Sequence, residues 1–255
     1  MRLTANHIAA LICVYFVALC LFYARATPFF EAPDEAAHFL YAHNLLETGE
    51  LPTLLDGRDA IFASQATQRH HPPLYYMASA LMIAPTERAD VDAYLRLNPL
   101  GTSGTVSDNN QNVYLHNWHA PEGDTHIAIW INRLFSIALA TGTLLMIHRI
   151  GTLAFNKPVG LLAMLLAASI PTFVFISASI NNDNLVTFFY AAGILWTLNV
   201  WREGVIRWRD VAVISAILAG VALSKVNGLT LFGLVYGGLM LGYLRGRYGL
   251  GWVVL

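Results

Sequence analysis

The sequence predicts an all-α polytopic membrane protein with about six to seven transmembrane helices and a large first outer loop carrying short interfacial helices. Apolar residues make up 56% of the 255 residues and charged residues 12%, which is about half the usual charged share of soluble domains. The apolar residues gather in runs long enough to cross a bilayer, which takes about 20 helical residues. The net charge of −1 gives no basic field, so we expect no nucleic-acid partner.

The first predicted span covers residues 8–24, which contain no charge and follow Arg2. A cleaved signal peptide is the alternative, because residues 24–26 (Ala-Arg-Ala) resemble a cleavage site. We favour an uncleaved helix, since the apolar run exceeds a typical signal-peptide core and further spans follow. Cys13 and Cys20 fall inside this run, so we expect them to pack against other helices and to form no disulfide.

Residues 27–126 form the polar outer loop, which holds thirteen of the sixteen acidic residues. We expect a helix over residues 36–46, with Pro33 in its first turn. A second apolar helix, over residues 74–84, is too short to span and should lie along the membrane interface or re-enter it. Residues 98–124 are rich in Gly, Ser, Asn and Asp, which is typical of a surface loop.

Five further spans are predicted at residues 127–147, 159–177, 185–201, 211–224 and 229–244. Pro171 should kink the second of these five. The last one carries small residues at about fourfold spacing, which favours close helix packing; they are Gly233, Gly237, Gly238 and Gly242. The chain thus divides into a first transmembrane helix (1–26), an outer loop (27–126) and a region with the remaining helices and the start of a seventh (127–255).

The cations between the spans all fall on one side, which the positive-inside rule makes cytoplasmic; they are Arg2, Arg149, Lys157, Arg202, Arg207, Arg209, Arg245 and Arg247. The large loop and the short links around Asp183 and Lys225 then share the outer side. Residues 252–255 look like the opening of another span. We therefore expect the chain to be a fragment or a shortened form of a longer protein.

Asp34 and Glu35 stand where the chain leaves the membrane, with Glu31 as a third nearby carboxylate. A partly buried carboxylate among like charges binds its proton more tightly, which suits a general base. The alternative is a pair of ordinary first-turn helix acids. His38, four residues after Asp34, is placed either to orient that carboxylate or to lie on the helix surface.

A His-His-Pro-Pro-Leu-Tyr-Tyr stretch, residues 70–76, lies in the same loop. Its prolines fix the backbone direction and should present Tyr75 and Tyr76 to the interface, where tyrosine is common. A divalent metal is the less favoured interpretation, because adjacent histidines on an extended segment point to opposite sides. The candidate ligands for such an ion are His70, His71, His116 and His119.

Two cations and one carboxylate lie near the outer ends of spans. Arg133 and Lys225 can set the depth of their helices by snorkelling, or they can bind a lipid-linked phosphate at that depth. Asp183 lies in an Asn-rich turn, which needs no further explanation, but it shares the outer side with Asp34 and is a second candidate acid.

Taken in order, these motifs resemble the GT-C superfamily of polytopic glycosyltransferases, in particular the protein O-mannosyltransferases and the lipid A aminoarabinose transferase. Those enzymes open with a transmembrane helix and a long outer loop that bears an Asp-Glu pair before a helix, as Asp34-Glu35 does here. A later His-Pro-Pro-Leu segment is matched by residues 71–74, an Arg-Leu pair in the next span by Arg133-Leu134, and a lysine near the outer end of a later span by Lys225. Uncharacterised bacterial membrane proteins with Pro-Asp-Glu and Asn-Asn-Asp-Asn segments look similar too.

The resemblance implies an inverting transferase that takes a sugar from a polyprenyl-phosphate donor at the outer face of a bacterial inner (plasma) membrane. The acceptor hydroxyl would belong to a protein, a lipid or a glycan. Asp34 and Glu35 would form the catalytic pair, with Asp34 as the base. The substrate site would be lined by His38, His71, Arg133, Asp183 and Lys225.

Two alternatives belong to other classes. A transporter or flippase of lipid-linked substrates needs ionisable groups near the bilayer midplane, whereas these charges cluster at the outer boundary. A non-catalytic membrane scaffold related to GT-C enzymes would keep the large loop and bind partners through it. A donor-flipping assay without acceptor separates the first alternative from a transferase, and donor lipid bound beside Lys225 separates the second.

Overall fold

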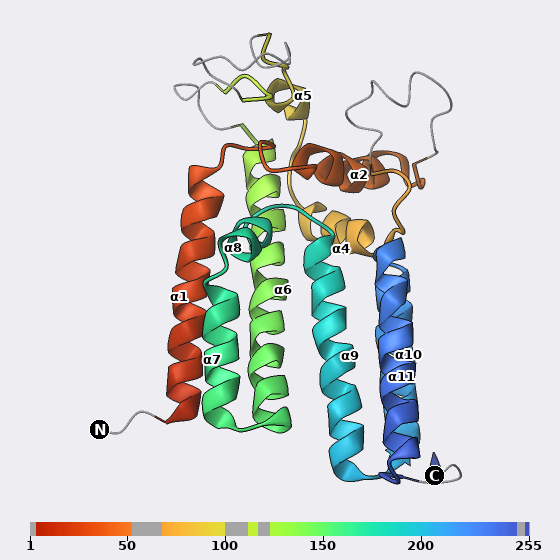
Figure 1. Ribbon diagram of the computed structural model, residues 1–255. Coiled ribbons are helices and arrows are strands. Elements are labelled where there is room, and N and C mark those ends of the chain that lie inside the picture. Colours follow the sequence, from red (N-terminus) through yellow and green to blue (C-terminus); the bar gives the residue numbers. More distant parts are fainter. Residues whose placement is uncertain (1–3, 53–67, 100–111, 117–122, 249–252, 255) are drawn as a thin grey trace.

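The computed structural model describes residues 4–52, 68–99, 112–116, 123–248 and 253–254, and most of these residues are helical (Figure 1). The long helices stand side by side as α1 (Ala5–Ala26), α6 (Thr125–Ala154), α7 (Lys157–Ala168), α9 (Asp183–Glu203), α10 (Trp208–Ala222) and α11 (Thr230–Leu244). The shorter helices are α2 (Glu35–Thr48), α4 (Leu74–Ile83), α5 (Val91–Tyr94), α8 (Pro171–Ser177) and the 3₁₀ helix η1 (Val226–Leu229). The predicted all-α membrane protein is confirmed.

Four helical segments are long and apolar enough to cross a membrane; they are Ala5–Ala26, Thr125–Ala154, Asp183–Glu203 and Val226–Leu244. A fifth exists if α7 and α8 are counted together, although the two helices are bent by 70°. α10 has only 15 residues, which gives about 22 Å against a hydrocarbon core of about 30 Å. By length and composition the described residues thus hold four or five spans, fewer than the six to seven predicted.

The bend between α7 and α8 has a local cause in the sequence. Pro171 is the first residue of α8, where its missing N–H costs no helical hydrogen bond. The residue before a proline is driven out of the helical region, and Ile170 is extended with φ −75° and ψ 114°. The kink predicted at Pro171 is therefore a full break in the helix.

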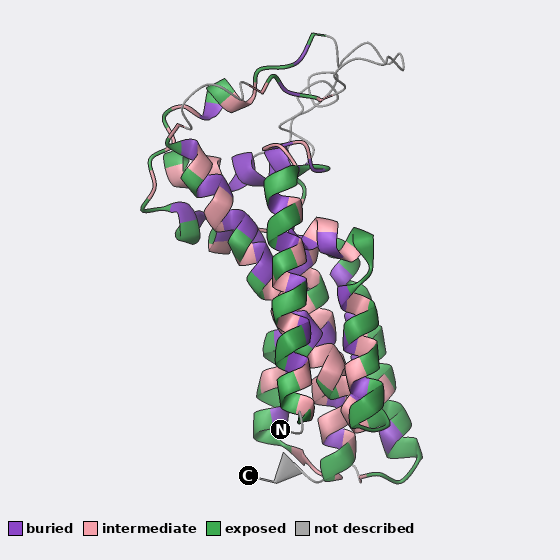
Figure 2. Ribbon diagram, turned by 90° about the vertical axis from the view of Figure 1, so that its left-hand side faces the viewer, coloured by how far each residue is buried: buried purple, intermediate pink, exposed green. Residues whose placement is uncertain are grey.

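Three apolar clusters hold the bundle together. One, around Phe16, joins α1 to α6, α7 and α8; another, around Val221, joins α9, α10 and α11. The third, around Phe39, fastens α2 and α4 to α6, and Figure 2 shows the buried residues gathered there. Large apolar side chains such as Phe22 and Leu166 stay exposed on the outer surfaces, as expected where helices face lipid.

The first helix and its cysteines follow the prediction. α1 starts after Thr4, whose hydroxyl accepts a hydrogen bond from the His7 N–H. Cys13 and Cys20 are both free thiols, and Cys20 is fully buried in the cluster around Phe16.

α6 and α7 approach each other closely at two glycines, which the sequence analysis did not single out. A Cβ added at Gly160 would lie 2.4 Å from the His148 carbonyl oxygen, and one added at Gly151 would lie 2.8 Å from the Cα of Gly160. In α11, by contrast, two of the four glycines predicted to pack have no atom within 4 Å of an added Cβ among the described residues. Small residues therefore matter more at the α6–α7 contact.

α2 and α4 lie across one end of the bundle, which we call the loop end (Figure 1). The helices predicted over residues 36–46 and 74–84 are confirmed as α2 and α4. Pro33, expected in the first turn of α2, lies in the turn before it. Gly49 ends α2 with a φ of +69°, a left-handed conformation that glycine adopts without strain.

The opposite end, which we call the basic end, carries the cations assigned above to one side; those in the described residues are Arg149, Lys157, Arg202, Arg207, Arg209, Arg245 and Arg247. There β1 (Ile206–Arg207) pairs in parallel with β2 (Val253–Val254). The predicted opening of a seventh span over residues 252–255 is thus a short strand at 253–254, and residues 252 and 255 lie outside the described residues.

Candidate functional site

The turn between α1 and α2 separates the two carboxylates of the Asp-Glu pair. Asp34 has a φ of +60° and is exposed, whereas Glu35 begins α2 and is fully buried. Phe30, in the same turn, also has a positive φ of 66°. Such backbone costs about 1–3 kcal/mol per residue and is concentrated at functional sites. The prediction of a partly buried carboxylate at Asp34 is therefore wrong. The buried carboxylate is that of Glu35.

Glu35 is held by four hydrogen bonds. Its Oε1 accepts from Arg133 Nε at 2.8 Å and from the Ile180 N–H at 3.1 Å. Its Oε2 accepts from Arg133 Nη2 at 2.6 Å and from the Phe30 N–H at 3.0 Å. This bidentate pair joins α2, α6, the strained turn and the link between α8 and α9 at one buried point.

Arg133 uses its remaining donors on the end of α1. Nη1 donates to the carbonyl oxygens of Ala24 and Thr27, at 2.5 and 3.0 Å, and Nη2 donates to that of Pro28 at 3.1 Å. A guanidinium has five N–H groups, so all of them are satisfied within the protein. The phosphate-binding or snorkelling Arg133 predicted from the sequence is instead a fully buried brace in this structure.

Lys225 lies between α10 and η1 and pairs with Asp183 at the start of α9, with Nζ 2.6 Å from Oδ1. The Lys225 side chain is 21% exposed and that of Asp183 is 47% exposed, so the pair faces the loop end and not the core. Asn182 donates to the Ser224 carbonyl at 3.3 Å and fixes the two links side by side.

The His-Pro-Pro segment is docked beside this ion pair. The Leu74 N–H donates to the carbonyl oxygen of Leu223 at 2.9 Å, which places the start of α4 at the end of α10. The His71 carbonyl accepts from the Tyr41 hydroxyl at 3.3 Å, which ties the segment to α2 as well. The hydrogen bond between Leu74 and Leu223 therefore brings His71 close to Lys225, because each of these residues is near one of its partners in the chain.

His38 is buried and does not lie on the helix surface. It packs with Tyr41, His71 and Tyr76, and we call these four residues the loop-end cluster. The Nδ1 of His38 lies 2.9 Å from the Tyr76 hydroxyl, and its ring stacks on that of His71 with centroids 6.3 Å apart. Tyr75 and Tyr76 are fully buried, so the prediction that they face the interface is wrong. Tyr76 stacks on Tyr41 with centroids 3.7 Å apart.

The histidines of the cluster are neutral at pH 7. Burial, followed by the charges of His71 and Lys225, lowers the pKa of His38 from 6.5 to about 3. Burial, with His70 and Lys225, lowers the pKa of His71 to about 4, against an opposing effect of Asp183. His38 and His71 thus both lie within electrostatic reach of Lys225, and His71 also lies within reach of Asp183.

Tyr76 connects the cluster to the Asp-Glu turn. Burial first of all raises its pKa, with further contributions from Tyr75 and Tyr41 and from the negative charges of Asp183 and Asp34. The Asp34 carboxylate itself has no hydrogen bond or ion pair within the part of the chain that the structure describes. The exposed carboxylate of Asp34, which has no partner among the described residues, thus lies near the loop-end cluster, and the paired Lys225 adjoins the same cluster.

The remaining loop candidates have other partners. Glu31 accepts hydrogen bonds from the Val113 and Tyr114 N–H groups and from His116 Nε2, at 2.7–2.9 Å, and so fastens residues 112–116 to the turn. His70 and His71 do not point to opposite sides as expected, because residues 68–70 form a turn and the ring centroids are 4.1 Å apart.

No group of three or more His, Cys, Asp or Glu side chains suited to a metal ion occurs among the described residues. His119, one of the candidate ligands, lies outside them.

The sequence analysis missed the roles of Tyr76 and Asn182 at the site. The signals that point to these two residues are their places in the His-Pro-Pro stretch and in the Asn-rich turn.

Comparison with known proteins gave a family match in the second half of the chain. Residues 125–243 match the family model described as dolichyl-phosphate-mannose-protein mannosyltransferase. This region runs from α6 into α11 and contains Arg133, Asp183 and Lys225. No curated protein and no solved structure matches the chain. Residues 125–243 of this membrane protein are therefore similar to a GT-C superfamily domain, and over these residues the resemblance seen in the sequence is confirmed.

Proposed function

We propose that this protein is an inverting glycosyltransferase that moves a sugar from a polyprenyl-phosphate donor to the hydroxyl of a protein, lipid or glycan acceptor. The reaction takes place at the outer face of a bacterial inner membrane, on the loop end, with residues 27–126 as the outer loop. One observation carries the proposal. The loop end gathers an exposed, unpartnered carboxylate, Asp34, and a partly exposed cation, Lys225, around one buried cluster.

Asp34 serves as the general base. As the acceptor oxygen attacks the anomeric carbon, its proton moves to the Asp34 carboxylate. The bond between that carbon and the phosphate oxygen breaks, and the electron pair leaves on the lipid phosphate. Because one displacement replaces the phosphate from the opposite side, the configuration at the anomeric carbon inverts.

Lys225 stabilises the leaving phosphate. An ammonium group has three N–H donors, and the structure assigns Nζ one hydrogen bond, to Asp183. The other donors are free to meet phosphate oxygens on which negative charge grows during the reaction. Asp183 holds the ammonium in place, and the neutral His38 and His71 leave it as the local positive charge.

Glu35 and Arg133 act as positioning residues in this proposal. They bind the backbone of Phe30 and Pro28 at the start of the strained turn that presents Asp34. This differs from the sequence prediction, in which Glu35 shares catalysis and Arg133 lines the substrate site. Their burial and complete hydrogen bonding favour the structural role.

The test is sugar transfer by purified protein in proteoliposomes supplied with a polyprenyl-phosphate-linked sugar. D34N keeps the size of the side chain but removes its basicity, so kcat should fall by about 10²-fold or more. D92N, at an exposed aspartate in α5, is the matched control and should retain wild-type turnover. Unchanged turnover in D34N would exclude the proposed mechanism.

A further inference from the structure

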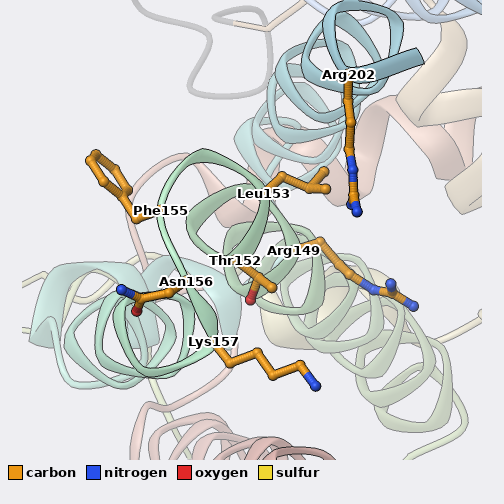
Figure 3. A pocket seen from close by; sticks show the side chains of 7 residues that line it. All are labelled: Arg149, Thr152, Leu153, Phe155, Asn156, Lys157 and Arg202. Atoms are coloured by element: carbon orange, nitrogen blue, oxygen red, sulfur yellow. The ribbon is translucent and has the colours of Figure 1, made fainter.

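The basic end contains a cavity of about 660 Å³, on the opposite side of the bundle from the proposed active site. It lies where α6 passes into α7 and where α9 ends, and it is lined by Arg149, Thr152, Leu153, Phe155, Asn156, Lys157 and Arg202 (Figure 3). In Figure 3 the Arg202 side chain extends from α9 toward α6, while Arg149 and Lys157 extend in a common direction. Three helices, α6, α7 and α9, thus contribute one cation each to the cavity.

Among the described residues, no carboxylate lines this cavity and none pairs with its three cations. Within the described part of the chain, no hydrogen bond or ion pair joins the side chain of Arg149, Lys157 or Arg202 to another group. The neighbouring acid, Glu203, is directed elsewhere, because its Oε2 pairs with both Arg207 and Arg209. Three like charges around one hollow repel one another, and an anion in it would relieve that repulsion.

The surroundings match the boundary between cytosol and lipid. Phe155, on the rim, is 75% exposed, and Leu162 and Leu166 expose apolar surface further along α7. α7 starts at the cavity, so the positive end of its dipole adds to the field of the cations. A ligand there would have an anionic head beside the cations and an apolar tail along α7.

We propose that this cavity binds the phosphate headgroup of an anionic membrane phospholipid. Arg149, Lys157 and Arg202 contact the phosphate oxygens, and the acyl chains lie against the exposed apolar face of α7. Basic pockets between transmembrane helices on the cytoplasmic side are suited to this class of ligand. The site is independent of the proposed transferase reaction, since it lies at the other end of the bundle.

The test measures binding of phosphatidylglycerol by native mass spectrometry, with the full chain in detergent micelles containing phosphatidylcholine. R149Q/R202Q should weaken phosphatidylglycerol binding by about 30-fold, at roughly fivefold for each cation near an anionic headgroup. R245Q/R247Q removes the same two charges from the basic end but outside the cavity, and its affinity should stay within about threefold of wild type. R149K/R202K keeps both positive charges and should retain binding. It is the control for misfolding caused by replacing the two arginines.

Three outcomes would overturn the proposal. Equal losses in R149Q/R202Q and R245Q/R247Q would show a general effect of positive charge at the basic end. Equal retention of phosphatidylcholine and phosphatidylglycerol by the wild type would show no preference for an anionic head. Full displacement of the lipid by millimolar inorganic phosphate would assign the cavity to free anions.

Discussion

Arg133 and Glu35 join the parts of the chain that surround the Asp34 turn. Their side chains are fully buried and share two hydrogen bonds, and the arginine also caps the carbonyl end of α1. Breaking one partner of a buried pair leaves an uncompensated charge in a medium that solvates it poorly. The stability of the loop end should therefore depend on both residues together.

The first prediction concerns this pair. E35Q should destabilise the protein by about 3 kcal/mol or more, because Arg133 then keeps a buried charge without its counter-ion. E47Q is the matched control: Glu47 pairs with Arg88 at an exposed position, and its loss should cost less than about 1 kcal/mol. Thermal melting in detergent measures both variants. A melting midpoint for E35Q equal to that of E47Q would contradict the structural role of the pair.

The second prediction concerns pH. An unfolded histidine takes up a proton near pH 6.5, whereas folded His38 does so only near pH 3, so the unfolded state binds more protons between these values. The contribution of neutral His38 to the free energy of unfolding is therefore fully present above pH 6.5 and is lost as the pH falls toward 3. His71, Lys225, Tyr75 and Tyr76 face His38. Burial and the positive charges of His71 and Lys225 lower its pKa and so produce this asymmetry.

Melting midpoints of wild type and H38Q between pH 7 and pH 5 test this directly. At pH 7 the wild type should be more stable by about 1 kcal/mol, the usual worth of a hydrogen bond such as that to Tyr76. By pH 5 the difference should vanish or reverse, because the unfolded wild type takes up a proton on this histidine while the folded protein does not, and H38Q lacks the titrating group. Parallel curves for the two proteins would exclude His38 as a source of the pH dependence.

At this scale the sequence predicts which residues meet but not how each one is used. The Asp-Glu pair, Lys225 and Asp183 lie at one end, as the topology indicates. Asp34 adopts a positive φ directly before α2, and there its carboxylate is exposed whereas that of Glu35 is buried. Local periodicity carries no information about such a dihedral angle.

The packing of α6 against α7 depends on two glycines, which leads to the third prediction. G160A places a methyl group 2.4 Å from the His148 carbonyl oxygen, so it should destabilise the helix pair by about 1–3 kcal/mol. G233A is the control in α11, where no described atom lies within 4 Å of the added Cβ. It should be neutral or stabilise the protein by up to about 1 kcal/mol.

Melting in detergent also measures this pair of variants. A stable G160A with a destabilised G233A would mean that the tight contact belongs to α11, as the glycine spacing in the sequence predicted. The existence of α1, α2, α4, α6 and α9 follows from apolar runs, although α6 with 30 residues extends beyond the span predicted at residues 127–147. The α6–α7 contact does not, because it depends on tertiary packing. The sequence predicts a kink at Pro171 but not its angle of 70°.

The two ends of the molecule carry different sets of charged groups. The loop end holds the carboxylates, Lys225 and the neutral histidines, and the basic end holds the phospholipid cavity proposed above. Alternating helix direction produces this separation, since α6, α9 and α11 start at the loop end whereas α1, α7 and α10 start at the basic end. The sequence predicts the same separation through its cation pattern.

The fourth prediction assigns each end to a side of the membrane. In a C13A/C20A background, E50C places a thiol at an exposed position of the loop end, and R245C places one at the basic end. A membrane-impermeant maleimide should label E50C in intact cells but label R245C only after permeabilisation, because short loops rich in arginine stay cytoplasmic. The reverse pattern would put Asp34 and Lys225 on the cytosolic side, and the polyprenyl-phosphate donor would then have to be used there.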